Sequence, residues 1–444
     1  MHYLVLVCPE GRWNRQKSNA DGSRAHHMTE VPVRYRDSRL IDESGKLYHG
    51  DFLLHKDGSW SKSKGDEDVK FNLNGSDRLI TRSLQNWHTH LSMILNRGMG
   101  EDLPLQRWLN EMIFPTEKKL TKELVELGTK AACAELIATG TTFACDMYYF
   151  PKEMANAIIE SGIRGIAGGT VTDFPTTSYP NGPEQAINDL DKLLKEGTGN
   201  SRVEYAVAPH AIYTCGKETL IKSSELARKH QSFLITHASE TRNEVATCHK
   251  ENNCYPIEYL DSIDFFSNNK TALAHCGWLK KNEMRLMAKY DSKAIHCPTS
   301  NMKLGIGGTM SYPAMKEAGV DIRLGTDGAA SNNSLDLRQE AKMASMIQRH
   351  DHWDASILNP QELWKLATKG SKDWVAWNID DIRMQPHGID ERRLLANIVY
   401  SNADCLDVWV DGIELRHGGI TMSLNMEEIK EKIKHSVKDY YDGI

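Results

Sequence analysis

Apolar and polar positions along residues 121–327 repeat in a regular order, an amphipathic helix followed by a short apolar strand. The first unit joins TKELVELGTKAACAELIATG, with apolar residues three and four positions apart, to the apolar run TTFACDMYY. Six further units of this kind follow, and the run LQNWHTH precedes them, so the pattern predicts eight strands. Strands that alternate with helices form parallel sheets. We therefore expect an α/β fold, a (β/α)8 TIM-like barrel.

The two ends of the chain follow a different pattern. RLIDESGKLYHGDFLLHKDGSW near the start and LANIVYSNADCLDVWVDGIELRHGG near the end are short apolar runs separated by glycine and aspartate turns. We expect both ends to form one small β-sandwich domain, residues 28–83 and 376–444, beside a metal-binding barrel of residues 84–375. Residues 1–27 are irregular and polar, and we expect an N-terminal extension there.

Composition and charge exclude several classes of protein. Hydrophobic residues make up 40% of the chain and charged residues 26%, a globular balance. The apolar opening Tyr3 to Cys8 is too short to span a membrane, so we expect no membrane association. The net charge of −6 includes no large basic block, which argues against a nucleic-acid partner. Nine scattered cysteines without a C-x-x-C pair are typical of reduced thiols, and we expect a cytoplasmic protein.

Ionisable side chains follow one predicted strand after another. In a (β/α)8 barrel the carboxyl ends of the strands meet at one rim, where side chains from separate strands converge. His88 and His90 lie two residues apart and would face the same side of the first strand. The later strands end in His210, His237 with Glu240, His275, His296 and Asp327. One such histidine is most often structural, whereas a repeated series indicates a shared site.

His88, His90, His237 and Asp327 form a candidate metal site. Three neutral imidazoles and one carboxylate suit a divalent ion with one position left for water. No lysine ends the strand VEYAVAPHA, where a two-metal site would need a bridging carbamylated lysine. We therefore expect one metal ion per chain, Zn²⁺, with Fe²⁺ as the alternative.

Six stretches of the sequence resemble motifs of the amidohydrolase superfamily, and they occur in the family's order. They are NWHTHLSMILNRGMGEDLPLQRWL, APHAIYTC, THASETRNEV, LAHCGWL, HCPTSNMKLGIG and LGTDGAASNNSLDL. The chain resembles most closely the branch of methylthioadenosine/S-adenosylhomocysteine deaminases and triazine chlorohydrolases. This resemblance implies a hydrolase that acts on carbon–nitrogen bonds in cyclic amidines and assembles as a homo-oligomer.

The resemblance also implies catalytic roles. A metal ion would lower the pKa of a bound water, and Asp327 and His275 would take or steer the proton of that water during attack on an aminated ring carbon. Glu240, three residues after His237, would protonate the adjacent ring nitrogen and relay the proton to the leaving ammonia. The alternative for Glu240 is a solvated acid at the start of a helix.

Residues for substrate binding are implied in the same way. Glu117 in FPTEKKL and His210 occupy positions that contact the ribose in the nucleoside-deaminating branch, and a carboxylate can accept two ribose hydroxyl groups. The alternative for Glu117 is a partner of a helix dipole. Trp108 would wall the pocket, although a core position is the ordinary role of such an aromatic side chain. The branch often carries arginines after its third strand, where this chain has Gly168 and Gly169.

Together these features predict a metal-dependent hydrolytic deaminase of an amino-purine nucleoside, of the adenosine, methylthioadenosine or S-adenosylhomocysteine type. The enzymatic alternatives are a deaminase of a free base or a pterin, and a triazine-type chlorohydrolase. A non-catalytic scaffold is a further alternative, which the complete ligand set with Glu240 and His275 opposes. In each enzymatic case the partner is a small heteroaromatic molecule.

Overall fold

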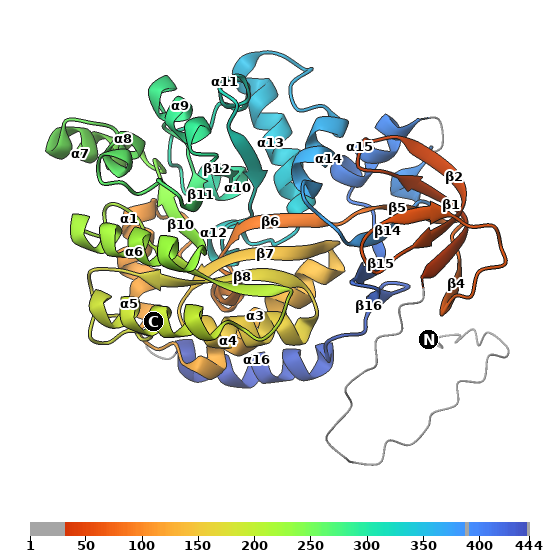
Figure 1. The fold of residues 1–444 in the computed structure, drawn as a ribbon, viewed down its shortest axis with the longest axis horizontal. Coiled ribbons are helices and arrows are strands. Elements are labelled where there is room, and N and C mark those ends of the chain that lie inside the picture. The colour runs from red at the N-terminus through yellow and green to blue at the C-terminus, as the bar shows by residue number, and fades with distance from the viewer. Residues whose placement is uncertain (1–31, 387–389, 442–444) are drawn as a thin grey trace, which may run out of the picture.

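The computed structural model describes residues 32–386 and 390–441, and its larger part is an eight-stranded parallel sheet (Figure 1). The strands are paired in chain order: β6 (Leu84–Thr89), β7 (Thr141–Tyr148), β8 (Arg164–Val171), β9 (Val203–Pro209), β10 (Phe233–Ala238), β11 (Lys270–His275), β12 (Lys293–His296) and β13 (Asp321–Leu324). The last strand, β13, packs against the first, β6, so the sheet curls back on itself. The predicted (β/α)8 barrel is confirmed.

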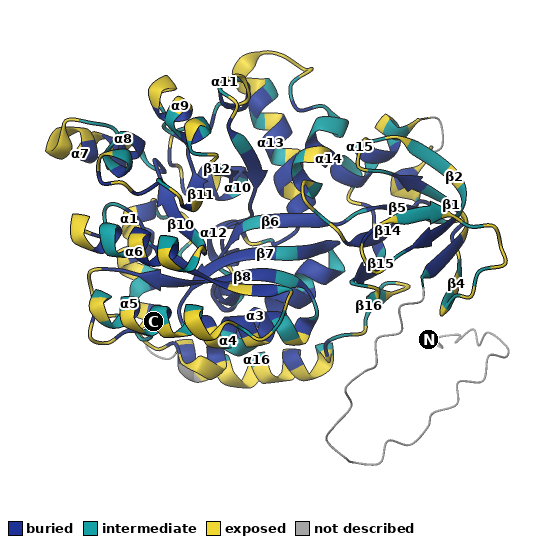
Figure 2. Ribbon diagram, viewed as in Figure 1, coloured by how far each residue is buried: buried dark blue, intermediate teal, exposed yellow. Residues whose placement is uncertain are grey.

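Helices surround this sheet and turn their polar faces to solvent, while the strands are almost entirely buried (Figure 2). The longer helices after β6 are α3 (Lys122–Ala138), α4 (Pro151–Ser161), α5 (Pro183–Glu196), α6 (Lys217–His230), α7 (Arg242–Asn252), α8 (Pro256–Ser262), α9 (Lys281–Lys289), α13 (Leu337–His352) and α14 (Pro360–Thr368). Thr121 caps the start of helix α3, and its hydroxyl accepts a hydrogen bond from the Leu124 amide. Within residues 32–386 and 390–441, no helix is long and apolar enough to cross a membrane.

Short helical segments lie at the carboxyl ends of the strands. They are η1 (Leu91–Asn96), α1 (Leu105–Trp108), η2 (Leu109–Ile113), α2 (Phe114–Glu117), α10 (Pro298–Lys303) and α12 (Ala329–Asn332). A further short helix, α11 (Tyr312–Glu317), leads into β13. Inside the barrel, the core consists mainly of small and aliphatic side chains from the strands. Trp87 packs there against Phe143 and Phe233, near the starts of β7 and β10. The barrel interior is therefore filled, and chemistry is confined to the rim.

A second sheet of nine strands is built from both ends of the chain, as predicted. Its strands are β1 (Val33–Ile41), β2 (Leu47–Leu54), β3 (Trp60–Lys62), β4 (Phe71–Asn74), β5 (Arg78–Arg82), β14 (Trp374–Asn378), β15 (Cys405–Val410), β16 (Ile413–His417) and β17 (Ile420–Thr421). The pairing of β1 with β2 is irregular between Tyr35 and Ser38, and β1 pairs with β4 before this point and with β5 after it. The sheet thus bends around a core that includes Tyr35, Phe52 and Trp409.

The chain leaves this sheet twice to pack on the barrel. After β14 and the short η3 (Ile382–Met384), α15 (Glu391–Ser401) contacts α13 and α14, and the last helix, α16 (Met426–Tyr441), lies along α3 (Figure 1). Tyr440 in α16 donates a 2.9 Å hydrogen bond to Asn96 Oδ1. The domain limits given above remain predictions, and the expected extension at residues 1–27 lies outside the described residues.

Candidate active site

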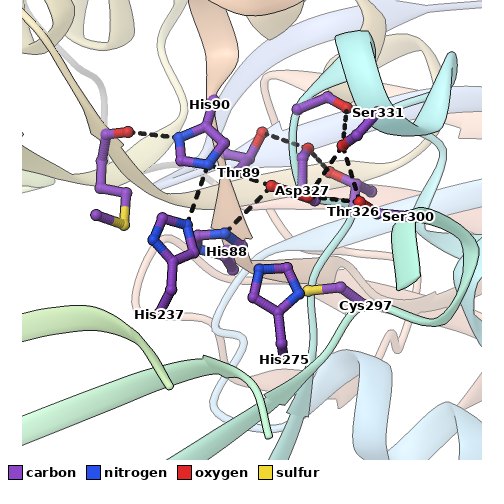
Figure 3. A network of polar contacts seen from close by, with 12 residues as sticks. His88, Thr89, His90, His237, His275, Cys297, Ser300, Thr326, Asp327 and Ser331 are labelled. Carbon is purple, nitrogen blue, oxygen red and sulfur yellow. Dashed lines mark hydrogen bonds and ion pairs between the residues drawn. The ribbon is translucent and has the colours of Figure 1, made fainter. Parts of the chain in front are cut away.

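The four predicted metal ligands meet at the carboxyl end of the barrel (Figure 3). His88 belongs to β6, His90 follows its last residue, His237 belongs to β10 and Asp327 follows β13. One ligand atom from each of the four lies within 4.8 Å of the other three. The Nε2 atoms of His88 and His90 are 3.3 and 3.2 Å from Asp327 Oδ1, and His237 Nε2 is 3.4 Å from His90 Nε2.

Backbone carbonyls orient two of these imidazoles. His90 Nδ1 lies 2.6 Å from the Met147 carbonyl oxygen, and His237 Nδ1 lies 2.8 Å from the His210 carbonyl oxygen. A carbonyl oxygen only accepts hydrogen bonds, so Nδ1 carries the proton and the Nε2 lone pair faces the centre of the site. Neither buried ring nitrogen of His88 makes a hydrogen bond to a described residue. A divalent cation at the centre would satisfy His88 Nε2, and this donor set fits such an ion.

Burial also favours the neutral form that a ligating histidine needs. It lowers the pKa of His88 to about 4 and the pKa of His237 well below its ordinary range. Burial acts in the same direction on His90, but the hydrogen bond and charge of Asp327 outweigh it and raise the pKa of His90 to about 9. A metal ion bound between His90 and Asp327 would replace that proton and keep the pairing of opposite charges.

The carboxylate of Asp327 is held by hydroxyl groups on its far side. Its Oδ2 accepts hydrogen bonds from Ser300 Oγ at 2.6 Å and Ser331 Oγ at 2.9 Å, while Oδ1 faces His88 and His90 (Figure 3). The pattern of strand-end residues did not identify these serines, which lie in the short helices α10 and α12 and have no distinctive spacing. They fix which oxygen of Asp327 is available to a metal ion.

Glu240 and His275 form a second pair beside the ligands. His275 Nε2 lies 3.7 Å from Glu240 Oε1, and both side chains are buried. His275 Nδ1 lies 2.8 Å from Asn301 Oδ1, an acceptor, so Nδ1 carries the proton and Nε2 is free to accept one. Burial raises the pKa of Glu240, although the charges of nearby histidines oppose this effect. A carboxyl group with a raised pKa is suited to donate a proton near neutral pH.

Glu244 binds the backbone at Glu240, and this contact was not predicted from the sequence. Its carboxylate accepts hydrogen bonds from the backbone amides of Ser239 at 2.9 Å and Glu240 at 2.8 Å. Burial and the charge of Glu240 raise the pKa of Glu244 to about 7. The only sequence signal is an acid four residues after Glu240, which is also common at the start of a helix. Glu244 fixes the backbone from which the Glu240 side chain projects.

The three residues predicted to bind substrate line the same small cavity as Glu240 and His275, of about 50 Å³. Glu117 is 7% exposed and accepts a 3.1 Å hydrogen bond from the Tyr149 hydroxyl. Burial raises the pKa of Glu117 to about 7, against the effect of two neighbouring tyrosine hydroxyls. His210 Nδ1 lies 2.9 Å from Thr214 Oγ1, and Trp108 Nε1 donates to the Met99 carbonyl at 3.1 Å.

His296 ends β12 but does not belong to this group. It is 2% exposed and lines a different hollow, with Asn301 and the glycines of residues 305–308. Burial lowers the pKa of His296 to about 4. A place at the end of a barrel strand is therefore insufficient to put a histidine in the site.

Comparisons with known proteins point to one family. A model described as "Amidohydrolase family" matches residues 79–374. A 5′-deoxyadenosine deaminase from Methanosphaera stadtmanae is 38% identical over 80% of this chain and 86% of its own length. A 5-methylthioadenosine/S-adenosylhomocysteine deaminase from Thermodesulfovibrio yellowstonii is 37% identical over 78% and 82%. The zinc-bound structure of an adenosine deaminase from Xanthomonas campestris has a similar fold, with a TM-score of 0.85, 24% identity and coverage of 92% and 98%.

Proposed function

The chain belongs to the amidohydrolase family, and we propose that it is a metal-dependent deaminase of an amino-purine nucleoside of the adenosine or 5′-substituted adenosine type. It is a hydrolase that acts on carbon–nitrogen bonds in cyclic amidines. Two relatives support a nucleoside substrate. They are named 5′-deoxyadenosine deaminase and 5-methylthioadenosine/S-adenosylhomocysteine deaminase. The reaction consumes water, replaces the ring amino group by an oxygen and releases ammonia.

One observation carries this proposal: a set of three imidazoles and one carboxylate suited to a metal ion faces a buried glutamic acid. His88, His90, His237 and Asp327 would hold a divalent ion, which when bound lowers the pKa of water toward about 7. Asp327 Oδ1 faces the centre of this ligand set, and His275 Nε2 is free to accept a proton. We propose Zn²⁺ rather than Fe²⁺, in keeping with the zinc-bound relative in fold. Elemental analysis of the purified protein tests this choice.

Glu240 is the proposed proton donor to the ring. Its carboxyl, with a raised pKa, lies within 3.7 Å of His275 Nε2 in the same cavity. In the proposed reaction Glu240 protonates a ring nitrogen beside the carbon that is attacked. It then takes up the proton that His275 or Asp327 received from water and passes it to the leaving amino group. As the carbonyl forms, the remaining proton of the attacking hydroxyl returns to Glu240, so protons balance. This relay leaves the protein unchanged after each turnover.

Glu117, His210 and Trp108 are the proposed substrate contacts. All three line the inner cavity, and Glu117 and Tyr149 mark its outer limit, where the cavity meets a second hollow. In its charged form, the Glu117 carboxylate would accept hydrogen bonds from the ribose hydroxyl groups. His210 and Trp108 would contact the base or sugar from the other walls. A cytoplasmic location and a homo-oligomer remain predictions from the sequence.

Ammonia release from a panel of compounds tests the proposal. The panel contains adenosine, methylthioadenosine, S-adenosylhomocysteine, guanine, cytosine and a pterin, assayed with protein of known metal content. Turnover of the nucleosides alone is the expected result. Turnover of free bases or the pterin alone would assign a different amidohydrolase substrate, and no turnover with metal bound would favour dehalogenation, tested next with a chlorinated triazine.

A further inference from the structure

A second hollow adjoins the inner cavity of the candidate active site. Phe114, Glu117 and Tyr149 line the inner cavity of about 50 Å³, and the same three side chains line an outer groove of about 690 Å³. Cavities that enclose small-molecule ligands are typically about 300–1,000 Å³. A nucleoside whose ring reaches the metal ligands therefore extends past these three residues into the outer groove.

One wall of this groove is apolar, while Asn110, Thr176 and Thr177 add polar groups elsewhere in its lining. Phe114 in α2 and Phe174 in the loop after β8 meet edge to face, with ring centroids 5.5 Å apart. Pro175 and Pro180 from the same loop continue the wall. Phe174 is 36% exposed, and a large apolar side chain exposed beside a reaction cavity is suited to contact a ligand.

Hydrogen bonds fix the loop on either side of the Phe174 ring. Asp173 accepts hydrogen bonds from the Gly216 amide at 2.7 Å and from Thr219 Oγ1 at 2.6 Å. Thr172 Oγ1 donates to the Phe174 carbonyl at 2.8 Å. The groove wall is thus largely formed before a ligand arrives, which lowers the entropic cost of binding.

The groove offers little charge for an ionic ligand group. Among the described residues that line it, the acidic and basic side chains are Glu117 and Lys118. Glu117 is buried at the junction with the inner cavity, where the proposed function places the ribose, and Lys118 is exposed. An exposed ion pair contributes little to binding. An amino-acid tail would bring both a carboxylate and an ammonium group against phenyl and proline surfaces, which costs desolvation energy.

We propose that this outer groove takes the 5′ substituent of the nucleoside and selects an uncharged apolar substituent, such as methylthio, over an amino-acid tail. The inference rests on the proposed function and specifies its substrate class. Phe114 and Phe174 contact the substituent, while Glu117 holds the sugar at the junction. Contact with one or two apolar groups typically changes kcat/KM by about 10-fold or more, which sets the expected size of the preference.

The test compares kcat/KM for 5′-methylthioadenosine, adenosine and S-adenosylhomocysteine with the metal-loaded full chain. We expect the value for 5′-methylthioadenosine to exceed that for S-adenosylhomocysteine by about 10-fold or more. Phe174→Ala should lower the value for 5′-methylthioadenosine about 10-fold more than the value for adenosine. Trp353→Ala is the control, because it removes an aromatic side chain that is 95% exposed at the end of α13 and should leave all three values unchanged.

An equal or higher kcat/KM for S-adenosylhomocysteine would overturn the inference, as would an equal loss for 5′-methylthioadenosine and adenosine in Phe174→Ala. Calorimetric titration separates this failure from a failure of the proposed function. Binding of 5′-methylthioadenosine that weakens in Phe174→Ala, without ammonia release, would support the groove and overturn the deaminase function. Absence of binding for all three nucleosides would overturn both.

Discussion

Replacing Glu244 by glutamine tests whether the backbone beneath Glu240 must be held in place. The carboxylate accepts hydrogen bonds from two buried amides, Ser239 at 2.9 Å and Glu240 at 2.8 Å. Glutamine keeps one acceptor oxygen, but its amide group would face the other backbone N–H donor. A buried donor left without a partner costs about 1–3 kcal/mol, so Glu244→Gln should lower the free energy of unfolding by that amount.

The same change should lower kcat, since the proton donor loses its fixed position. Loss of a partner that orients a functional group typically costs about 10–100-fold in activity, and we expect a fall of this size in kcat for a nucleoside. Urea unfolding, steady-state kinetics and metal content would be measured on one preparation. Glu251→Gln is the matched control, because Glu251 is exposed on the same helix, α7. Unchanged kcat in Glu244→Gln, or loss of metal rather than of kcat, would refute the positioning role.

Three further predictions concern residues around the ligands and the substrate. Asn301→Leu removes the acceptor at 2.8 Å from His275 Nδ1, so kcat should fall about 10–100-fold while metal content stays constant. A kcat equal to that of the wild type would contradict a role of Asn301 in orienting His275. The double variant Ser300→Ala, Ser331→Ala removes both donors to Asp327 Oδ2. Metal affinity, measured by chelator competition, should fall about 10–100-fold. Unchanged affinity would show that the two hydroxyls are dispensable. Burial raises the pKa of Glu117 to about 7, so this carboxyl gains a proton and loses its charge as the pH falls through about 7. KM for a nucleoside should therefore rise as the pH falls. Glu117→Gln should show a high KM without this pH dependence.

The barrel and the meeting of the four candidate ligands were predictable because both depend on short-range patterns. Alternation of helical and strand periodicity identified the eight strands, and their shared direction brings the strand ends to one rim. His88 and His90 were expected on one strand, but β6 ends at Thr89, and its pairing with β7 is irregular between Asn86 and Thr89. The two imidazoles nevertheless reach the same centre.

Other features depend on contacts between distant segments, which the sequence pattern does not specify. Ser300 in α10 and Ser331 in α12 both meet Asp327, and Asn301, which follows Ser300 in α10, meets His275. Serine and asparagine in these short helices have no distinctive spacing, so only the folded chain shows their partners. The bend of the second sheet and the packing of α16 along α3 likewise arise from tertiary contacts, since the amphipathic pattern of a helix leaves its neighbour unspecified.

The most direct test of the account measures metal content and ammonia release together in the wild-type protein and in Glu240→Gln. We expect the wild type to hold one metal ion per chain and to deaminate an adenosine-type nucleoside. Glu240→Gln should retain the metal and lose at least about 100-fold in kcat, the lower end of the contribution of a general acid. Undiminished deamination by Glu240→Gln with metal bound would contradict the proton relay at the centre of the account.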